Sequence, residues 1–449
     1  MAISDRAAVE LKQDLNESSF CASILREPMD VVSGQSLNCA NGRLDSLSTS
    51  ANVKRMQSIV VLILFTIAGL FARRPDQFMH PYIWVEDGYY NLKTFAEKGI
   101  YVLIEPIAGY ELFASKLLSY IAFRISVPYS PEIEIVLITA MTCGIMLAIA
   151  LSPTHLPHPF LCAAGALLVP QAPEVFAVSA YASWWAGLLL FLVPLWRWEC
   201  QRLRWFYILF GGMSSPTIFP ILVIQTLRAL LDRNRLEWLS AALCAIVAGV
   251  QGFLLWKMSG TAGSPLIETA TVLPDTIRYV GSFFVGNQVG QDYYFQSGII
   301  AILVLSALGW LARDRLDRYF GMLVAMFFAA CIASLMRQRI SWVHPFTAGP
   351  RYFFYPFVLS IWIGIWIAAK SSMAGRILLA TTYVLTIMFA APKMTWRHDP
   401  LDWRAQLVAC ADTDAYDLPI LWWNGDARDV HWRKFLGEEC QAFLSQSLF

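Results

Sequence analysis

Charged side chains are scarce in this chain of 449 residues: Asp, Glu, Lys and Arg make up 15% of it, whereas 57% is hydrophobic. A soluble domain is usually about a quarter charged and about half apolar. Here the apolar residues form successive runs of about 17–20, each long enough to cross a hydrocarbon core of roughly 30 Å. The ~10-residue alternating segments typical of transmembrane barrels are missing. We therefore expect an all-α polytopic membrane protein with the lipid bilayer as its first partner.

Other patterns are missing as well. The 9 cysteines include no CxxC motif and no paired Cys/His spacing, so we expect no zinc site. A net charge of +1 gives no reason to expect a nucleic-acid partner. Residues 1–55 are rich in Ser, Asn and Asp and lack a signal-peptide pattern. We predict a disordered cytoplasmic tail over 1–55, a transmembrane core over 56–392 and a small external C-terminal segment over 393–449.

Basic residues orient the predicted spans. Short basic connections at 197–204, 228–235 and 313–318, and more weakly at 370–376, should lie in the cytoplasm with the N-terminus. This threading predicts about 10 membrane-spanning segments and an external, periplasmic C-terminus. The complete spans are expected at 56–72, 110–126, 132–151, 184–196, 238–255, 299–311, 319–335, 352–369 and 377–391.

Two segments do not fit simple crossings. The stretch 206–227 has predicted cytoplasmic flanks and is interrupted by glycine, serine and proline, so we expect a broken or re-entrant helix hairpin. The apolar run 161–169 would have to begin and end outside, which favours an incomplete helix. Alternatively, the segment 110–126 lies on the membrane surface instead of crossing it. A long external loop is expected over 259–295.

Two neighbouring carboxylates follow the first span. Glu86 and Asp87 lie between Trp84 and the pair Tyr89 and Tyr90. Carboxylates near a bilayer are costly and usually face a cavity or a partner, and a buried one with a raised pKa can act as a general base. Alternatively, they are solvated loop acids, with Asp87 capping the helix that follows.

Cations collect in the predicted external stretch 337–356, against the usual charge distribution of membrane proteins. Arginine holds phosphate oxygens through a planar fork of donors, so a lipid phosphate or pyrophosphate is the expected ligand. Alternatively, these arginines pair with acids of other loops or with lipid head groups. The candidate phosphate-binding residues are Arg337, Arg339, His344, Arg351 and Tyr352.

Four stretches together resemble the GT-C glycosyltransferases, and more closely a group of bacterial multi-pass membrane proteins of that type. They are "WVEDGYYN…EPIAGYELFASKL", "PEVFAVSAYASWW", "FGGMSSPTIFPILV" and "GPRYFFYP". The resemblance covers the chain from residue 56 onwards. It implies a GT-C-like fold in a bacterial inner membrane and a hexosyl- or pentosyltransferase. The donor would be a polyprenyl-phosphate sugar and the acceptor a glycan or lipid of the cell envelope.

The resemblance also implies roles for residues. Glu86 or Asp87 would be the catalytic base or bind the acceptor, and the residues do not separate the two. Candidate acceptor-binding residues are Trp84, Tyr89, Glu174 and Trp184. No DxD or DxE stands in a predicted external loop, so we expect no metal, and no cofactor beyond the lipid donor. The alternative function is a lipid or small-molecule transporter or flippase, since broken helices also suit transport.

The predicted external tail contains two cysteines, Cys410 and Cys440. An extracytoplasmic location permits a disulfide between them. An Asn-Gly turn signal follows an apolar run between the two, which predicts a strand or a hairpin inside the closed loop. Alternatively, both are free thiols in a cytoplasmic tail.

Overall fold

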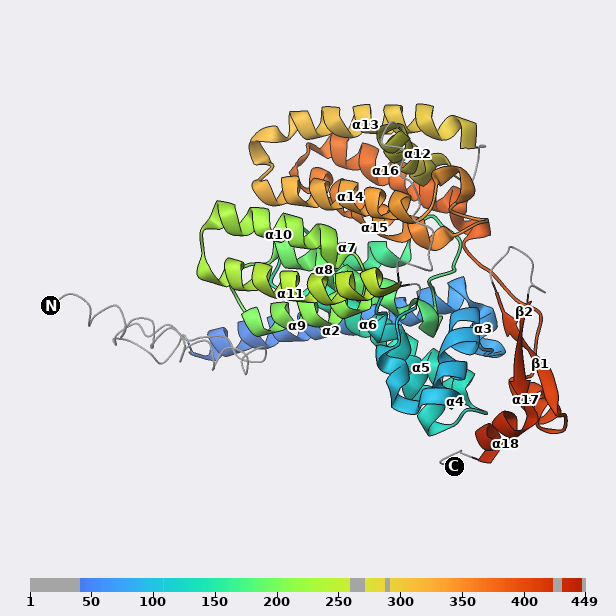
Figure 1. Ribbon diagram of the computed structural model, residues 1–449. Helices are drawn as coiled ribbons and strands as arrows, with labels where there is room; N and C mark the ends of the chain where they lie inside the picture. The colour runs from blue at the N-terminus through green and yellow to red at the C-terminus, as the bar shows by residue number, and fades with distance from the viewer. Residues whose placement is uncertain (1–40, 108, 259–270, 287–290, 423–429, 446–449) are drawn as a thin grey trace.

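The computed structural model describes residues 41–107, 109–258, 271–286, 291–422 and 430–445, and it is mostly helical (Figure 1). Within these ranges, 7 helices are long and apolar enough to cross a membrane. The chain is therefore a polytopic helical membrane protein, as predicted. The candidate spans lie in α2 (Asn41–Arg73), α6 (Ser130–Leu151), α11 (Arg235–Met258), α13 (Tyr294–Leu311), α14 (Arg318–Arg337), α15 (Phe354–Lys370) and α16 (Met373–Ala390).

Three helices are shorter than a membrane crossing requires, and two of them, at 113–125 and 182–192, lie where complete spans were expected. The three are α5 (Phe113–Ile125), α7 (Pro159–Leu167) and α8 (Ala182–Leu192). At 1.5 Å per residue, even α5 with its 13 residues covers only about 20 Å. Proline limits two of them, because Pro159 opens α7 and Pro194 lies in the 3₁₀ turn that follows α8. The incomplete helix expected over 161–169 is present as α7, whereas α5 and α8 are shorter than the spans predicted there.

The core lies where α8 and α15 pack together. Trp185 of α8 is fully buried, and its ring centroid is 5.0 Å from that of Phe354 at the start of α15. Trp362 is also fully buried and donates a hydrogen bond to the Cys162 carbonyl of α7. Burying such large aromatic side chains fixes these three helices relative to one another.

The helix hairpin expected over 206–227 is present as α9 (Gln201–Ser214) and α10 (Ile218–Asp232), separated by a short break. Protein groups satisfy the backbone freed by the break. Gln251 of α11 donates hydrogen bonds to the carbonyl oxygens of Gly212 (3.0 Å) and Met213 (3.3 Å). A broken helix inside a membrane protein is stable only with such partners.

The region expected to be one external loop contains a helix, so that prediction is wrong in part. α12 (Val272–Val285) buries Tyr279, Val280 and Phe283 and packs closely against α13. Asp275 and Arg278, which the sequence placed in the loop, form an ion pair at 2.7 Å in which Asp275 is buried and Arg278 is half-exposed. Residues 259–270 and 287–290 of the expected loop lie outside the described residues.

Two of the basic connections lie at the same end of the molecule. In Figure 1 the connection after α10 and the connection after α13 lie at the end of the molecule where α2 begins. The C-terminal segment lies at the opposite end. α2 begins at Asn41, so residues 41–55 are helical instead of disordered, and no proline interrupts that stretch. The disorder predicted for residues 1–40 concerns residues outside the described ranges.

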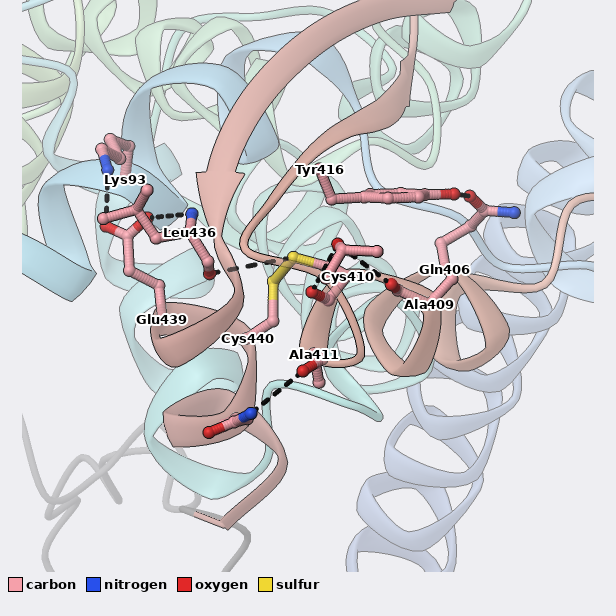
Figure 2. The surroundings of a disulfide bond; sticks show 11 residues. Lys93, Gln406, Ala409, Cys410, Ala411, Tyr416, Leu436, Glu439 and Cys440 are labelled. Carbon is pink, nitrogen blue, oxygen red and sulfur yellow. Dashed lines mark hydrogen bonds and ion pairs between the residues drawn. A yellow bond between two sulfur atoms is a disulfide. The ribbon is translucent and has the colours of Figure 1, made fainter.

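The C-terminal cap consists of α17 (Trp403–Ala411), β1 (Ala415–Leu421), β2 (Val430–Leu436) and α18 (Gly437–Ser445). The strands form an antiparallel hairpin, so the described fold is not entirely helical. The predicted disulfide is present: Cys410 of α17 is bonded to Cys440 of α18 (Figure 2). Lys93 forms an ion pair with Glu439 and thereby ties the cap to α4 (Lys93–Lys98). The predicted Asn-Gly turn lies outside the described residues.

Removing the disulfide should loosen the cap. The bond closes a loop with a sequence separation of 30 residues, for which the chain-entropy model gives about 3–4 kcal/mol. We expect Cys410→Ser to lower the free energy of unfolding of the cap by about 3 kcal/mol. Cys143→Ser, at a free and half-buried thiol, is the control. Proteolysis of the cap in detergent-solubilised protein measures the difference, and equal resistance in both variants would contradict the prediction.

Candidate functional site

The segment that contains Glu86 and Asp87 is held by the cap. It begins after α3 (Pro75–Met79) and continues as a π-helical turn, η2 (Glu86–Leu92). The Leu421 N–H of β1 donates to the Ile83 carbonyl at 3.2 Å, and the Tyr82 hydroxyl donates to the Pro419 carbonyl at 2.8 Å. π-Helical turns are rare and occur frequently at functional sites. Strand β1 therefore supports the segment along the approach to η2.

Gly88 permits this close approach. A Cβ atom at Gly88 would lie 2.8 Å from Ile420 Cδ1 of β1. The absence of a side chain at this position lets the π-helical turn and the strand pack against each other.

Asp87 is fully buried and accepts four hydrogen bonds. The Ser119 hydroxyl (2.6 Å) and the Asn91 amide (3.2 Å) donate to Oδ1. The Ser179 hydroxyl (2.7 Å) and the Ala180 N–H (2.9 Å) donate to Oδ2. Burial raises the pKa of Asp87 to about 6, and these hydrogen bonds limit the increase because they favour the charged form. Because both oxygens are occupied, Asp87 acts as an anchor for η2.

Glu86 differs from its neighbour. The Tyr181 hydroxyl donates to Oε1 at 3.2 Å, and Oε2 has no hydrogen-bond partner in the described part of the chain. Burial raises the pKa of Glu86 to about 7; Arg351 opposes the rise and Glu174 adds to it. A carboxyl group that titrates near neutral pH is suited to accepting a proton.

Arg351 lies beside Glu86 but is paired with an acid. Its Nη1 forms an ion pair with Glu174 Oε1, and its backbone N–H donates to Glu174 Oε2 at 2.9 Å. The same Nη1 donates to the Tyr181 hydroxyl at 3.0 Å. The Arg351 side chain is 28% exposed and that of Glu174 is 2% exposed. The alternative in which the arginine pairs with an acid of another loop therefore applies to Arg351, although its guanidinium still reaches the surface.

The Tyr181 hydroxyl connects the whole cluster. It donates toward Glu86 and, at 3.1 Å, toward Glu174, and it accepts from Arg351 and, at 3.2 Å, from the Trp84 indole N–H. Its single hydrogen serves one carboxylate at a time. The structure thus joins Glu86, Glu174 and Arg351, from three distant parts of the chain, into one polar cluster that we call the Tyr181 cluster.

The other predicted phosphate-binding residues lie in different surroundings. The Arg337 guanidinium lies over the Tyr110 ring at 5.6 Å, and that of Arg339 lies over Trp342 at 5.6 Å. The His344 Nδ1 accepts from the Phe346 N–H at 3.0 Å and so shapes its own turn. Burial and Lys393 lower the pKa of His344, so its surroundings favour the neutral ring.

The predicted acceptor-binding aromatic residues are mostly packing residues. Trp84 is almost fully buried, with its ring edge-on to Trp396 at 5.8 Å, so it offers no open face to a sugar. Trp184 packs on Tyr355 at 5.0 Å and edge-on to Tyr352 at 6.1 Å. Tyr89 is half-buried beneath the Arg433 guanidinium, 4.3 Å from the ring centroid.

Sequence reasoning missed four residues of the site: Tyr181, Ser179, Ser119 and Glu134. Tyr181 and Ser179 stand inside the quoted stretch "PEVFAVSAYASWW", but nothing marks them among other small and aromatic residues. Glu134 stands in the first turns of α6, where an acidic residue usually complements the helix dipole. Only their spatial convergence on η2 gives them a role.

No three His, Cys, Asp or Glu side chains gather as a metal-binding group within the described residues. Comparison of the chain with protein-family models, curated proteins and solved structures found no match.

Proposed function

We propose that this protein is a membrane glycosyltransferase that moves a sugar from a polyprenyl-phosphate donor to a glycan or lipid acceptor, with Glu86 as the general base. One observation carries the proposal. Glu86 has a pKa raised to about 7 and a carboxylate oxygen that no described residue contacts by a hydrogen bond, and it shares the Tyr181 cluster with an arginine that reaches the surface. A base and a cation placed together suit displacement of a phosphate.

In the proposed reaction an acceptor hydroxyl oxygen attacks the anomeric carbon of the sugar. The new glycosidic bond forms as the bond from that carbon to the phosphate oxygen breaks, which inverts the anomeric centre. The acceptor proton goes to Glu86 Oε2, and the electron pair leaves with polyprenyl phosphate. Arg351 stabilises the departing phosphate, and a well-placed donor of this kind supplies several kcal/mol.

The proposal divides the neighbouring carboxylates by role. Glu86 takes the proton, whereas Asp87 positions η2 through its four hydrogen bonds. Glu174 keeps the Arg351 guanidinium oriented. Glu86 Oε2 is covered by neighbouring side chains. The acceptor therefore reaches it only after these side chains move, and catalytic contacts often tighten only in the substrate complex.

The proposed side of the membrane is the external one. The site lies beside the cap, at the opposite end of the molecule from the basic connections after α10 and α13 (Figure 1). The positive-inside rule then leaves the N-terminus in the cytoplasm and the cap outside. A membrane-impermeant thiol reagent applied to intact cells tests this arrangement. We expect Cys410 and Cys440 to react only after reduction, and reaction only after permeabilisation would reverse the orientation.

Binding of the leaving group tests the function without knowledge of the sugar. We expect the purified protein to bind a polyprenyl phosphate, measured by native mass spectrometry or thermal stabilisation, and to bind the unphosphorylated polyprenol at least 10-fold more weakly. Equal binding of both would overturn the assignment. A transporter would also bind the phosphate, but it would not release it from a polyprenyl-phosphate sugar.

Arg351→Lys should weaken binding of the polyprenyl phosphate by about 10-fold or more. Lysine keeps the charge but loses the planar fork, and it cannot hold both Glu174 and a phosphate in the same geometry. Arg337→Lys is the matched control, because that arginine packs over an aromatic ring outside the Tyr181 cluster. Unchanged affinity in Arg351→Lys would show that Arg351 only anchors α15.

A further inference from the structure

Ser179 lies between two buried carboxyl groups. Its hydroxyl oxygen is 2.7 Å from Asp87 Oδ2 and 2.7 Å from Glu134 Oε2. Glu134 belongs to α6 and Asp87 to η2, so the hydroxyl joins two separate elements. A serine hydroxyl has one hydrogen and can donate to only one of these oxygens. The other short contact requires a hydrogen supplied by a carboxyl group.

The surroundings leave no cation to compensate two charges. Asp87, Glu134 and Ser119 face one another here, and in the described chain no lysine, arginine or histidine forms an ion pair with either carboxyl group. Glu86 is the next acid along η2 and belongs to the Tyr181 cluster. Two like charges at this separation in a buried site cannot both persist, so one carboxyl group keeps a proton.

The donors around the two groups decide which one keeps it. Three donors besides Ser179 approach Asp87: Ser119, Asn91 and the Ala180 N–H. Such donors favour the carboxylate form. Glu134 is approached only by the hydroxyls of Ser179 and Ser119, and it receives neither the Asn91 amide nor the Ala180 N–H. The arrangement is satisfied when the Glu134 carboxyl donates to the Ser179 oxygen and the Ser179 hydroxyl donates to Asp87.

The second carboxyl oxygen of Glu134 indicates that a further ligand binds here. Glu134 is 6% exposed, and its Oε1 has no hydrogen-bond partner within the described residues. The residue lines a cavity of about 10 Å³ together with Asp87, Ser179, Gln77 and Tyr82. A space of about this size with several polar partners holds one water molecule.

We propose that Asp87, Ser179 and Glu134 form a proton-binding site, in which Glu134 is the acid, Asp87 the carboxylate and Ser179 the bridge, with one water on Glu134 Oε1. This site joins the start of α6 to η2 and holds Asp87 in its anchoring position. It does not depend on the proposed transferase reaction, because it rests only on the geometry of these groups.

Infrared spectroscopy of the full-length protein in detergent tests the site. The spectrum is taken at about pH 8, where Glu86, with a pKa of about 7, is mostly ionised. We expect a protonated-carboxyl band in the wild type that shifts on labelling with ¹³C-glutamate. The band should be lost in Glu134→Gln and kept in Glu132→Gln, a half-exposed acid of the same helix paired with Arg404.

Two results would overturn the proposal: no such band in the wild type, or an unchanged band in Glu134→Gln. A band that shifts with labelled aspartate and not with labelled glutamate would place the proton on Asp87 and contradict the assignment. The glutamine amide can donate to Ser179 as the acid does, so we expect this variant to fold. If the variant does not fold, isotope labelling still identifies the protonated residue, because it uses the wild type alone.

Discussion

Glu86→Gln is expected to reduce sugar transfer by about 10²-fold or more, which is the usual effect of losing a general base. The glutamine oxygen can still accept the hydrogen bond from Tyr181, so the Tyr181 cluster keeps its shape. An amide cannot take up the acceptor proton. The measurement is the release of polyprenyl phosphate from a polyprenyl-phosphate sugar by the purified protein. A wild-type rate in this variant would remove Glu86 from the mechanism.

Asp87→Asn is the matched comparison, and we expect it to act on stability. Both oxygens of Asp87 accept hydrogen bonds, and an asparagine would turn an NH₂ group toward buried donors such as the Ala180 N–H. Leaving such groups unsatisfied costs about 1–3 kcal/mol. Thermal unfolding should therefore separate the two variants, with the glutamine variant stable and inactive. Equal stability with a complete loss of activity in Asp87→Asn would make Asp87 the base.

The Glu86 carboxyl group sets the expected pH dependence of the rate. The base must be ionised, so turnover should rise as the pH increases through about 7, the pKa of Glu86. Stability should change in the opposite direction. The folded pKa is raised from 4.5 to about 7, so the stabilising contribution is complete below about pH 4.5 and is lost as the pH rises through about 7.

The expected loss of stability is about 2 kcal/mol, which is less than the full shift implies because Glu86 is partly exposed. Glu86→Gln should remove the contribution of Glu86 to this pH dependence of stability. Unfolding midpoints measured across the pH range check the sign.

Gly281→Ala is expected to destabilise the α12–α13 pair by about 3 kcal/mol or more, the upper range for overpacking. A Cβ atom at Gly281 would lie 1.8 Å from the Tyr294 carbonyl oxygen and 2.7 Å from the Gly298 nitrogen. Both are backbone atoms of α13, which cannot turn away as a side chain can. The two helices would have to separate, and small residues are what allow such close packing in membrane proteins.

Gly144→Ala is the control for this prediction. A Cβ atom at Gly144 in the middle of α6 meets nothing within 4 Å. The substitution should change stability by no more than about 1 kcal/mol, the size of the helix-propensity difference. Folded yield and unfolding midpoint in detergent measure both variants. Equal behaviour of the two would show that α12 and α13 are not in backbone contact.

Several properties follow from residue order alone. Long apolar runs predict membrane helices because the bilayer demands about 20 apolar residues per crossing. The break between α9 and α10 is visible as glycine, serine and proline at 211–216. The disulfide and the hairpin could also be predicted from the sequence, since the tail contains only two cysteines, Cys410 and Cys440. The helix α12 was not, because Asp275 and Arg278 conceal an amphipathic period in a segment too short to span.

The roles of individual residues in the site do not follow from the sequence. The neighbours Glu86 and Asp87 are equivalent in the sequence, and only the tertiary structure separates them. Asp87 turns toward four donors, whereas Glu86 turns toward Tyr181 and Arg351. The pKa of a carboxyl group depends on burial and on charges brought from distant segments, and those are properties of packing.

The same reason applies to the partners of both acids. By itself the sequence determined the class of protein, the position of the carboxylate pair after the first span and the cysteines of the cap. The pairing of Arg351 with Glu174 and the approach of Glu134 to Ser179 were decided only by the tertiary structure. Glu174 and Arg351 are 177 residues apart in the chain, and no local pattern encodes a contact over that separation. Burial makes the contact between Glu174 and Arg351 specific, because a buried charge is stable only with a partner placed at hydrogen-bonding distance.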